Sequence, residues 1–293
     1  MSQSVENGGD KGVTTLKLHY YKCNPTENMT ILVMDPVPST ERAAIANRLM
    51  AENHLYAEQV GFVTLVNHSD EEQGFHAILD MMGGEFCANA TRSLAAVLRY
   101  EGIPGISING EQVYNLKVSG VMETLKCRVL PLAREAVYQA SVELPLPVEL
   151  ETLQMKNDNR LVEGTLVVFP GITHLVVDDS QLTDRKAFQQ KVMNKLAHRK
   201  DEALGIMFYN PSTHYLTPLV WVRETDTLFW EKGCGSGTAA VGAYLADHFR
   251  QSISVDIAQP GGCLSIEAKW NQGIKKICLT GEISIVSNGI AFL

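Results

Sequence analysis

The feature that most constrains this chain is a Gly-rich turn that carries a cysteine and occurs twice. The turn at residues 83–87 ends in Cys87, and the turn at residues 232–237 carries Cys234, 147 positions later (234 − 87). A helical apolar pattern follows each cysteine, over residues 89–100 and 238–249. The residues expected to be buried in these helices are Leu94, Val97 and Leu98 in the first, and Val241, Tyr244, Leu245 and Phe249 in the second.

Other elements recur in the same order. Strand-like runs at residues 28–35 and 172–179 are 144 positions apart (172 − 28), and each precedes a helical pattern, near Ser39 and near Thr183. The phrase Glu58-Gln-Val-Gly-Phe then matches Glu202-Ala-Leu-Gly-Ile at the same offset. Further strand runs are expected at residues 75–80, 113–130, 219–230 and 252–285. Agreement of order, element type and offset indicates an internal duplication.

The duplication predicts an α+β fold of two pseudo-symmetric halves, each a mostly antiparallel sheet wrapped around a central helix. We expect residues 1–135 with 284–293 to form the N-terminal half, and residues 136–283 the C-terminal half. The active site is expected in the cleft between them. The Pro-containing, then polar, stretch 144–160 is a candidate boundary, and the last strand, near 289–293, is expected to cross back to the first half.

Composition narrows the class of protein. The chain has 293 residues, is 45% apolar and carries a net charge of −8, which excludes intrinsic disorder and argues against nucleic acid as a partner. It has no apolar run of about 18 residues, so no membrane span is expected. Residues 1–15 are polar and lack an apolar signal-peptide core, which indicates a loose tail and a cytoplasmic location.

Six cysteines are present, and no two stand at CxxC spacing, so neither a metal site nor a disulfide framework is expected. Only Cys87 and Cys234 precede helices, where the positive helix end lowers the pKa of a thiol. Cys127, Cys263 and Cys278 lie in strand-like runs and are expected to be buried packing residues. Cys23 is expected in a turn near Pro25.

Two thiols that face each other across one bound molecule suit stereochemical inversion. One thiolate removes a proton from carbon, and the opposite thiol protonates the other face. The backbone N–H groups of Ala88, Asn89, Gly235 and Ser236 are expected to bind a carboxylate next to that carbon and to stabilise the developing charge. The two thiols would titrate as a coupled pair. This chemistry requires neither a metal nor an organic cofactor.

Over nearly the whole chain, these residues resemble the diaminopimelate epimerase superfamily. The resemblance implies the duplicated fold, a cofactor-independent two-cysteine mechanism with Cys87 and Cys234 as proton acceptor and donor, a homodimer, and a substrate contact by Asn28. The segments that carry it are 84–92, around the first cysteine, 234–238, around the second, and the C-terminal strand phrases 260–267 and 279–282.

Within that superfamily the sequence is most similar to the histidine racemases of staphylopine-type metallophore pathways. This implies a racemase acting on histidine, with Glu58 as a polar substrate contact. The phrases that carry this resemblance are 24–32, 58–62, 85–87, 89–91, 230–231 and 236–239.

The chain departs from the diaminopimelate epimerases in two places. They have an arginine for the distal carboxylate before the second cysteine, whereas this chain has Glu231 and Lys232, and a lysine cannot copy a bidentate guanidinium. Their later asparagine is replaced in the phrase Gly171-Ile-Thr-His174. An acidic pocket suits an imidazole, which Glu58 or Glu231 could bond, although Glu231 could equally be a surface or capping acid. Diaminopimelate and other amino acids stay open as substrates.

Three other classes compete with the racemase. Residues 235–240 fit a dinucleotide-binding G-x-G-x-x-A motif with Asp256 following, but only 56 residues remain after Gly237 (293 − 237), too few for such a domain. A cysteine hydrolase would need a histidine partner such as His76 or His174. A non-catalytic amino-acid-binding protein would not exchange the substrate's α-proton.

Overall fold

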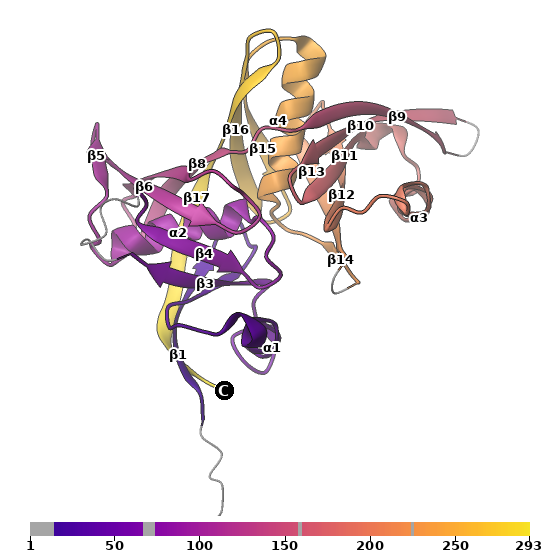
Figure 1. The fold of residues 1–293 in the computed structure, drawn as a ribbon. Coiled ribbons are helices and arrows are strands. Elements are labelled where there is room, and N and C mark those ends of the chain that lie inside the picture. Colours follow the sequence, from indigo (N-terminus) through magenta and orange to yellow (C-terminus); the bar gives the residue numbers. More distant parts are fainter. Residues whose placement is uncertain (1–14, 67–73, 158–159, 224–225) are drawn as a thin grey trace, which may run out of the picture.

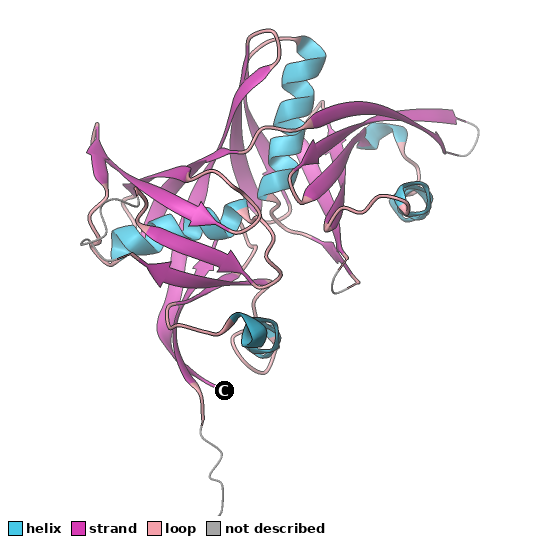
Figure 2. Ribbon diagram, in the orientation of Figure 1, coloured by secondary structure: helices cyan, strands magenta, loops and turns pink. Residues whose placement is uncertain are grey.

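Strands dominate this fold, and the helices are few (Figure 2). The computed structural model describes residues 15–66, 74–157, 160–223 and 226–293, so the expected N-terminal tail lies outside the described residues except for Thr15. Within these ranges, 17 strands connect through hydrogen bonds into one continuous sheet. The chain therefore has a mixed α/β fold with a sheet-dominated, barrel-like core.

The elements fall into two groups along the chain (Figure 1). The first group consists of β1 (Lys17–Asn24), β2 (Thr30–Val33), α1 (Ser39–Met50), β3 (Gln59–Leu65), β4 (Ala77–Met81), α2 (Ala88–Tyr100), β5 (Ile106–Ile108), β6 (Glu111–Val118), β7 (Leu125–Pro131) and β8 (Val137–Leu144). The second group consists of β9 (Glu149–Asn157), β10 (Arg160–Phe169), β11 (Ile172–Asp178), the short 3-10 helix η2 (Asp179–Gln181), α3 (Arg185–Leu196), β12 (Ala203–Asn210), β13 (Tyr215–Val222), β14 (Thr227–Trp230), α4 (Gly235–Phe249), β15 (Ile253–Gln259), β16 (Gly262–Trp270) and β17 (Ile274–Phe292).

The strands of the first group close into a ring. In order, β1, β2, β3, β4, β6, β7, β8 and β17 each pair with the next, and β17 pairs back with β1. Helix α2 packs against seven of these strands, and its residues 88–98 are all buried. A helix that is enclosed on all sides must be apolar or internally hydrogen-bonded around its whole circumference.

Strands of the second group follow the same pairing rules. In the first group β2 and β3 are parallel, β3 and β4 antiparallel, and β4 and β6 parallel. In the second group β11 and β12 are parallel, β12 and β13 antiparallel, and β13 and β15 parallel. Helix α4 packs against β10, β11, β12, β15, β16 and β17. The same sequence of pairings thus occurs twice along the chain.

One strand belongs to both groups. The 19-residue β17 pairs first with β16, then with β8, and over its last residues with β1, where Phe292 lies opposite Lys17. The return of the C-terminal residues to the first group is therefore confirmed. In Figure 1 this yellow strand runs from the upper, orange part of the molecule down to the indigo β1.

The two outer helices have the expected inward faces. Ile45 and Leu49 of α1, and Phe188, Val192 and Leu196 of α3, are buried. Helix α3 begins one residue after Asp184, whose carboxylate accepts the backbone N–H groups of Lys186 and Ala187, a standard N-cap. None of the helices in the described ranges is long and apolar enough to cross a bilayer.

Several local expectations were wrong. Phe249 is 57% exposed, because it is the last residue of α4, where the left-handed Arg250 ends the helix beyond the sheet. The run expected at residues 219–230 is not one strand but parts of two antiparallel strands, β13 and β14. The candidate boundary 144–160 stays a prediction, and it contains the strand β9, whose alternate residues Leu153 and Met155 are buried.

Two cysteine placements were also wrong. Cys23 lies in β1 rather than in a turn, and it is fully buried. Cys263 lies in β16, as expected of a strand residue, but it is exposed rather than packed in the core. Cys127 is buried as expected, and Cys278 is partly buried.

The burial difference between two phenylalanines is testable. Phe188→Ala should destabilise the protein by about 3–5 kcal/mol, because it empties a buried site where Phe188 meets Phe208 edge-on. Phe249→Ala, the matched control, should change the free energy of unfolding by less than about 0.5 kcal/mol. Urea denaturation measures both. Equal losses in the two variants would contradict the placement of α3 and α4.

Candidate active site

Each of the two repeated cysteines caps a helix with its own side chain. Cys87 has extended backbone angles and its Sγ accepts the N–H of Ala90 at 3.3 Å, so α2 begins at the next residue. Cys234 does the same for α4, with the N–H of Gly237 at 3.2 Å. The second helix therefore begins at Gly235, three residues before the expected start at Thr238. Each sulfur lies at the N-terminal end of its helix, where the helix dipole is positive.

The backbone N–H groups expected to bind the substrate carboxylate belong to the first two residues of each helix. Ala88 and Asn89 open α2, and Gly235 and Ser236 open α4. The first amides of a helix have no carbonyl one turn earlier to bond, so they are available to an acceptor from outside the helix. Two such sets of donors are suited to a carboxylate.

The two helix starts touch each other. A Cβ built on Gly235 would lie 3.0 Å from the Cβ of Ala88 and 3.1 Å from Oδ1 of Asn89, so a side chain at position 235 would force the helix starts apart. The Asn89 side chain also donates from Nδ2 to the carbonyl oxygen of Gly233 at 3.1 Å. The structure therefore brings the two cysteine turns into direct contact.

Polar and acidic residues surround this junction. The buried Asn28 donates from Nδ2 to Oε2 of Glu58 at 2.9 Å. A side-chain hydrogen bond joins Glu231 to Cys234, and the carboxylate of Glu231 also acts electrostatically on Cys87 and Glu58. Burial raises the pKa of Glu231 to about 7, against the lowering effect of its bond to Cys234. Burial likewise raises the pKa of Glu58.

Contrary to the expectation from the helix dipoles, neither thiol has a depressed pKa in this structure. Burial raises the pKa of Cys87 to about 12, and the N–H groups of Ala90 and Asn89 oppose this only in part. Burial, together with the negative carboxylate of Glu231, raises the pKa of Cys234 well above its usual value. Desolvation thus outweighs the helix ends, and both thiols are protonated in the ligand-free protein.

Four residues near the cysteines were not among the predicted site residues. Gln59 accepts the Cys87 thiol proton at 2.7 Å through Oε1, and Gln259 accepts the Cys234 N–H at 2.8 Å. Arg92, one turn after Cys87, is fully buried and donates to Asn89 at 2.8 Å. His174 lies 2.9 Å from Ser236 through Nε2. The available signals were the position of Gln59 beside Glu58 in a repeated phrase, the place of Arg92 in the motif 84–92, and the weighing of His174 as a hydrolase partner, whereas Gln259 had no signal.

The competing dinucleotide hypothesis is wrong. Strand β14 is antiparallel to β13, whereas β15 is parallel to β13. The strands that precede and follow α4 in the chain, β14 and β15, therefore run in opposite directions. A dinucleotide site needs parallel strands joined through the helix. Of the two histidines considered for a hydrolase, the His76 ring bonds the backbone of Asn115. The His174 ring is buried and bonds Ser236, whose Oγ lies 3.6 Å from the Cys234 sulfur.

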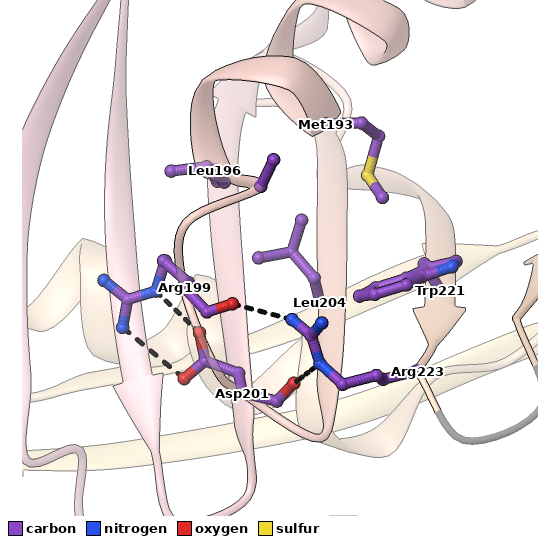
Figure 3. Close-up of a pocket in the computed structure, with 8 residues that line it drawn as sticks. Met193, Leu196, Arg199, Asp201, Leu204, Trp221 and Arg223 are labelled. Carbon is purple, nitrogen blue, oxygen red and sulfur yellow. Dashed lines mark hydrogen bonds and ion pairs between the residues drawn. The ribbon is translucent and has the colours of Figure 1, made fainter.

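Two further observations concern possible sites away from the cysteine junction. In the described parts of the chain, no three His, Cys, Asp or Glu side chains are grouped as a metal site requires. A cavity of about 160 Å³ lies between α3 and β12–β13, where Trp221 faces Arg223 and Arg199 pairs with Asp201 (Figure 3). None of the predicted site residues lines this cavity.

Two known proteins align with nearly the whole chain. The histidine racemases of Staphylococcus aureus and Fusobacterium nucleatum subsp. nucleatum are each 28% identical to this chain. The first aligns over 94% of this chain and 98% of its own length, and the second over 94% and 97%.

Solved structures share the fold at low identity. A hydroxyproline epimerase from Agrobacterium vitis, with bound trans-4-hydroxy-L-proline, has a TM-score of 0.64 and 11% identity, over 94% of this chain and 93% of that chain. A predicted epimerase from Pseudomonas aeruginosa has a TM-score of 0.63 and 10% identity, over 93% and 98%.

A family model described as the histidine racemase CntK N-terminal domain matches residues 17–292, nearly the whole chain. The chain therefore belongs to the histidine racemase family and is an isomerase of the amino-acid racemase class.

Proposed function

We propose that the protein interconverts L- and D-histidine without a cofactor, using Cys87 and Cys234 as paired proton-transfer groups. The observation that carries this proposal is the contact between two cysteine-capped helix starts, Ala88 against Gly235. This contact supports a site in which two thiols and the first amides of two helices surround one junction. No other pair among the six cysteines has this arrangement at helix starts in the described residues.

The proton steps balance in this arrangement. One cysteine, as thiolate, takes the Cα proton, which breaks the C–H bond and leaves its electron pair delocalised into the carboxylate. The amides of Ala88, Asn89, Gly235 and Ser236 stabilise that charge. The other cysteine, as thiol, then donates its proton to the opposite face of the carbon. The product has the opposite hand, and the two sulfurs have exchanged protonation states.

Glu231 supplies the missing base. Both thiols are protonated before substrate binds, because burial raises the pKa of each, so one must lose a proton. The Glu231 carboxylate bonds Cys234, and its pKa of about 7 suits proton exchange near neutral pH. We assign Glu231 the role of accepting the Cys234 proton when the reaction starts from the Cys234 thiolate.

The charge around the junction favours histidine over diaminopimelate. Lys232, whose charge acts on Glu58, is engaged with Glu27 at 3.0 Å, so it is poorly placed to bind a second carboxylate. Glu58 and Glu231 instead offer two carboxylates to a side chain that donates hydrogen bonds. An imidazole has such donors, whereas a distal carboxylate would meet like charge.

We further infer that the chain is a duplicated fold. Its two pseudo-symmetric halves, each a sheet around a central helix, would be residues 1–135 with 284–293 and residues 136–283, with the active site in the cleft between them. The recurring pairing order and the enclosed helices α2 and α4 support the duplication, and β8 lies at the boundary of the two halves, because it pairs with both β7 and β17. The family resemblance supports a homodimer, a cytoplasmic location and a product that enters metallophore synthesis.

Single cysteine variants test the mechanism. Cys87→Ser and Cys234→Ser should each lower the racemisation of L-histidine by at least about 100-fold, because a hydroxyl is a poor proton acceptor. Circular dichroism of the histidine follows the change of hand, and mass spectrometry in deuterated water follows α-proton exchange. Cys263→Ser is the matched control and should keep full activity, because Cys263 is an exposed strand residue.

The outcomes separate the alternatives. Exchange with meso-diaminopimelate but not with L-histidine would overturn the substrate and keep the mechanism. Full racemisation by both serine variants would overturn the mechanism. A covalent adduct trapped on Cys234 alone, with Cys87→Ser still active, would favour a cysteine hydrolase, and binding of histidine without exchange would favour an amino-acid-binding protein.

The raised pKa of Glu231 predicts the pH profile. The kcat/KM for L-histidine should rise as the pH increases through about 7, since only the ionised carboxylate can accept the Cys234 proton. Glu231→Gln should remove this rise and lower kcat/KM at pH 8 by at least about tenfold. Glu282→Gln, at an exposed ion pair with Arg134, is the control and should leave the profile unchanged. An unaltered acidic limb in Glu231→Gln would rule out this role.

A further inference from the structure

Arg92 is a buried cation that the proton-transfer steps above do not use. It lies on α2, one turn after Cys87, and it is the largest fully buried side chain in the described residues. Its Nη2 donates to Oδ1 of Asn89 at 2.8 Å. Within the described part of the chain, its Nε and Nη1 have no hydrogen-bond partner and no carboxylate forms an ion pair with it.

The fold makes a dedicated space for this side chain. A Cβ built on Gly281 of β17 would lie 2.6 Å from Nη1 of Arg92, so only glycine leaves room for the guanidinium there. Burial lowers the pKa of Arg92 to about 10, so it remains protonated at neutral pH. A buried charge without a counter-ion is strongly unfavourable unless the structure gains something from it.

Arg92 is connected to both cysteine turns. The ionisable groups that act on its charge are the thiols of Cys127 and Cys87. Through Asn89, which donates to the Gly233 carbonyl at 3.1 Å, its hydrogen-bond chain reaches the residue before Cys234. The guanidinium of Arg92 is thus connected, through Asn89, to the junction where the two helix starts meet.

We infer that Arg92 is a positioning residue and the fixed counter-charge for the negative charge that develops between Cys87 and Cys234. This inference rests on the proposed two-cysteine function. In the ligand-free protein both thiols are neutral, and the guanidinium charge is uncompensated. Loss of a thiol proton, or entry of a substrate carboxylate, supplies the missing negative charge. The low dielectric of the interior strengthens this attraction.

A purely structural role would give a different result. If Arg92 only holds Asn89 in place, its loss would loosen the junction without altering the ionisation of Cys87. If Arg92 acts through its charge, its loss raises the pKa of the thiol, because an opposite charge nearby favours the thiolate. The pH at which Cys87 becomes reactive therefore distinguishes the two roles.

The test is the pH dependence of iodoacetamide alkylation at Cys87 in the ligand-free, full-length protein, read by peptide mass spectrometry. Because the pKa of Cys87 is about 12, the profile is read below that value, where a rise of one pKa unit makes alkylation about tenfold slower at each pH. Arg92→Met should shift the profile by about this amount, and Arg92→Lys, which keeps the charge, by clearly less. Cys127→Asp should also make alkylation slower, because it places a carboxylate beside the guanidinium while the Arg92–Asn89 bond stays. Arg128→Met, at an exposed neighbour in β7, is the control and should leave the profile in place.

Far-ultraviolet circular dichroism shows whether the Arg92→Met and Cys127→Asp proteins fold. If one of them does not fold, the other still tests the inference. Unchanged alkylation profiles in a folded Arg92→Met or a folded Cys127→Asp protein overturn it. Steady-state kinetics add a second readout, since Arg92→Met should both raise KM and lower kcat for L-histidine. The proposed function fails in a separate way, by the absence of α-proton exchange in the wild-type protein whatever the alkylation profiles show.

Discussion

The close contact between the starts of α2 and α4 is the constraint on which the rest of the structure depends. It needs a glycine at position 235 opposite Ala88, and an asparagine at position 89 that reaches the Gly233 carbonyl. The helices can meet end to end only if the surrounding strands hold each helix on most sides, which the ring around α2 and the strands around α4 do. The arrangement concentrates the first amides of two helices, two sulfurs and one buried guanidinium at one junction.

At this junction, opposing effects act on the ionisation of the two thiols and of Glu231. Burial favours the neutral thiols and a protonated Glu231, while helix ends, backbone N–H groups and Arg92 favour negative charge at the same place. A site of this kind is inert when empty, since each thiol keeps its proton. A carboxylate-bearing substrate changes the balance, because it brings both an anion for the amides and the acidic carbon for the thiolate.

Much of this could be predicted from the sequence, because the repeat supplies two independent copies of each signal. Helices α1, α2 and α3 and the inward faces of Ile45, Leu94 and Phe188 followed from periodicity. The first turn of α4 did not, since its start at Gly235 depends on a side-chain cap that has no apolar signal. The exposed Phe249 shows the limit of periodicity at a helix end, where the sheet no longer covers the helix. Gln59 and Gln259 reach the cysteine turns through contacts distant in sequence, and Arg92 is enclosed on one side by Gly281 of β17.

The long strand β17 has a consequence for how the protein is made. The ring around α2 is completed only when residues 284–292 pair with β1, so β1 waits for a segment that lies at least 260 positions later in the chain (284 − 24). Such long-range pairing raises the contact order, which favours slow folding. The N-terminal part, although it contains most of its own strands, cannot finish folding during synthesis as an independent early domain would. Until then, the edges of β1 and β8 are unpaired and open to association with other chains.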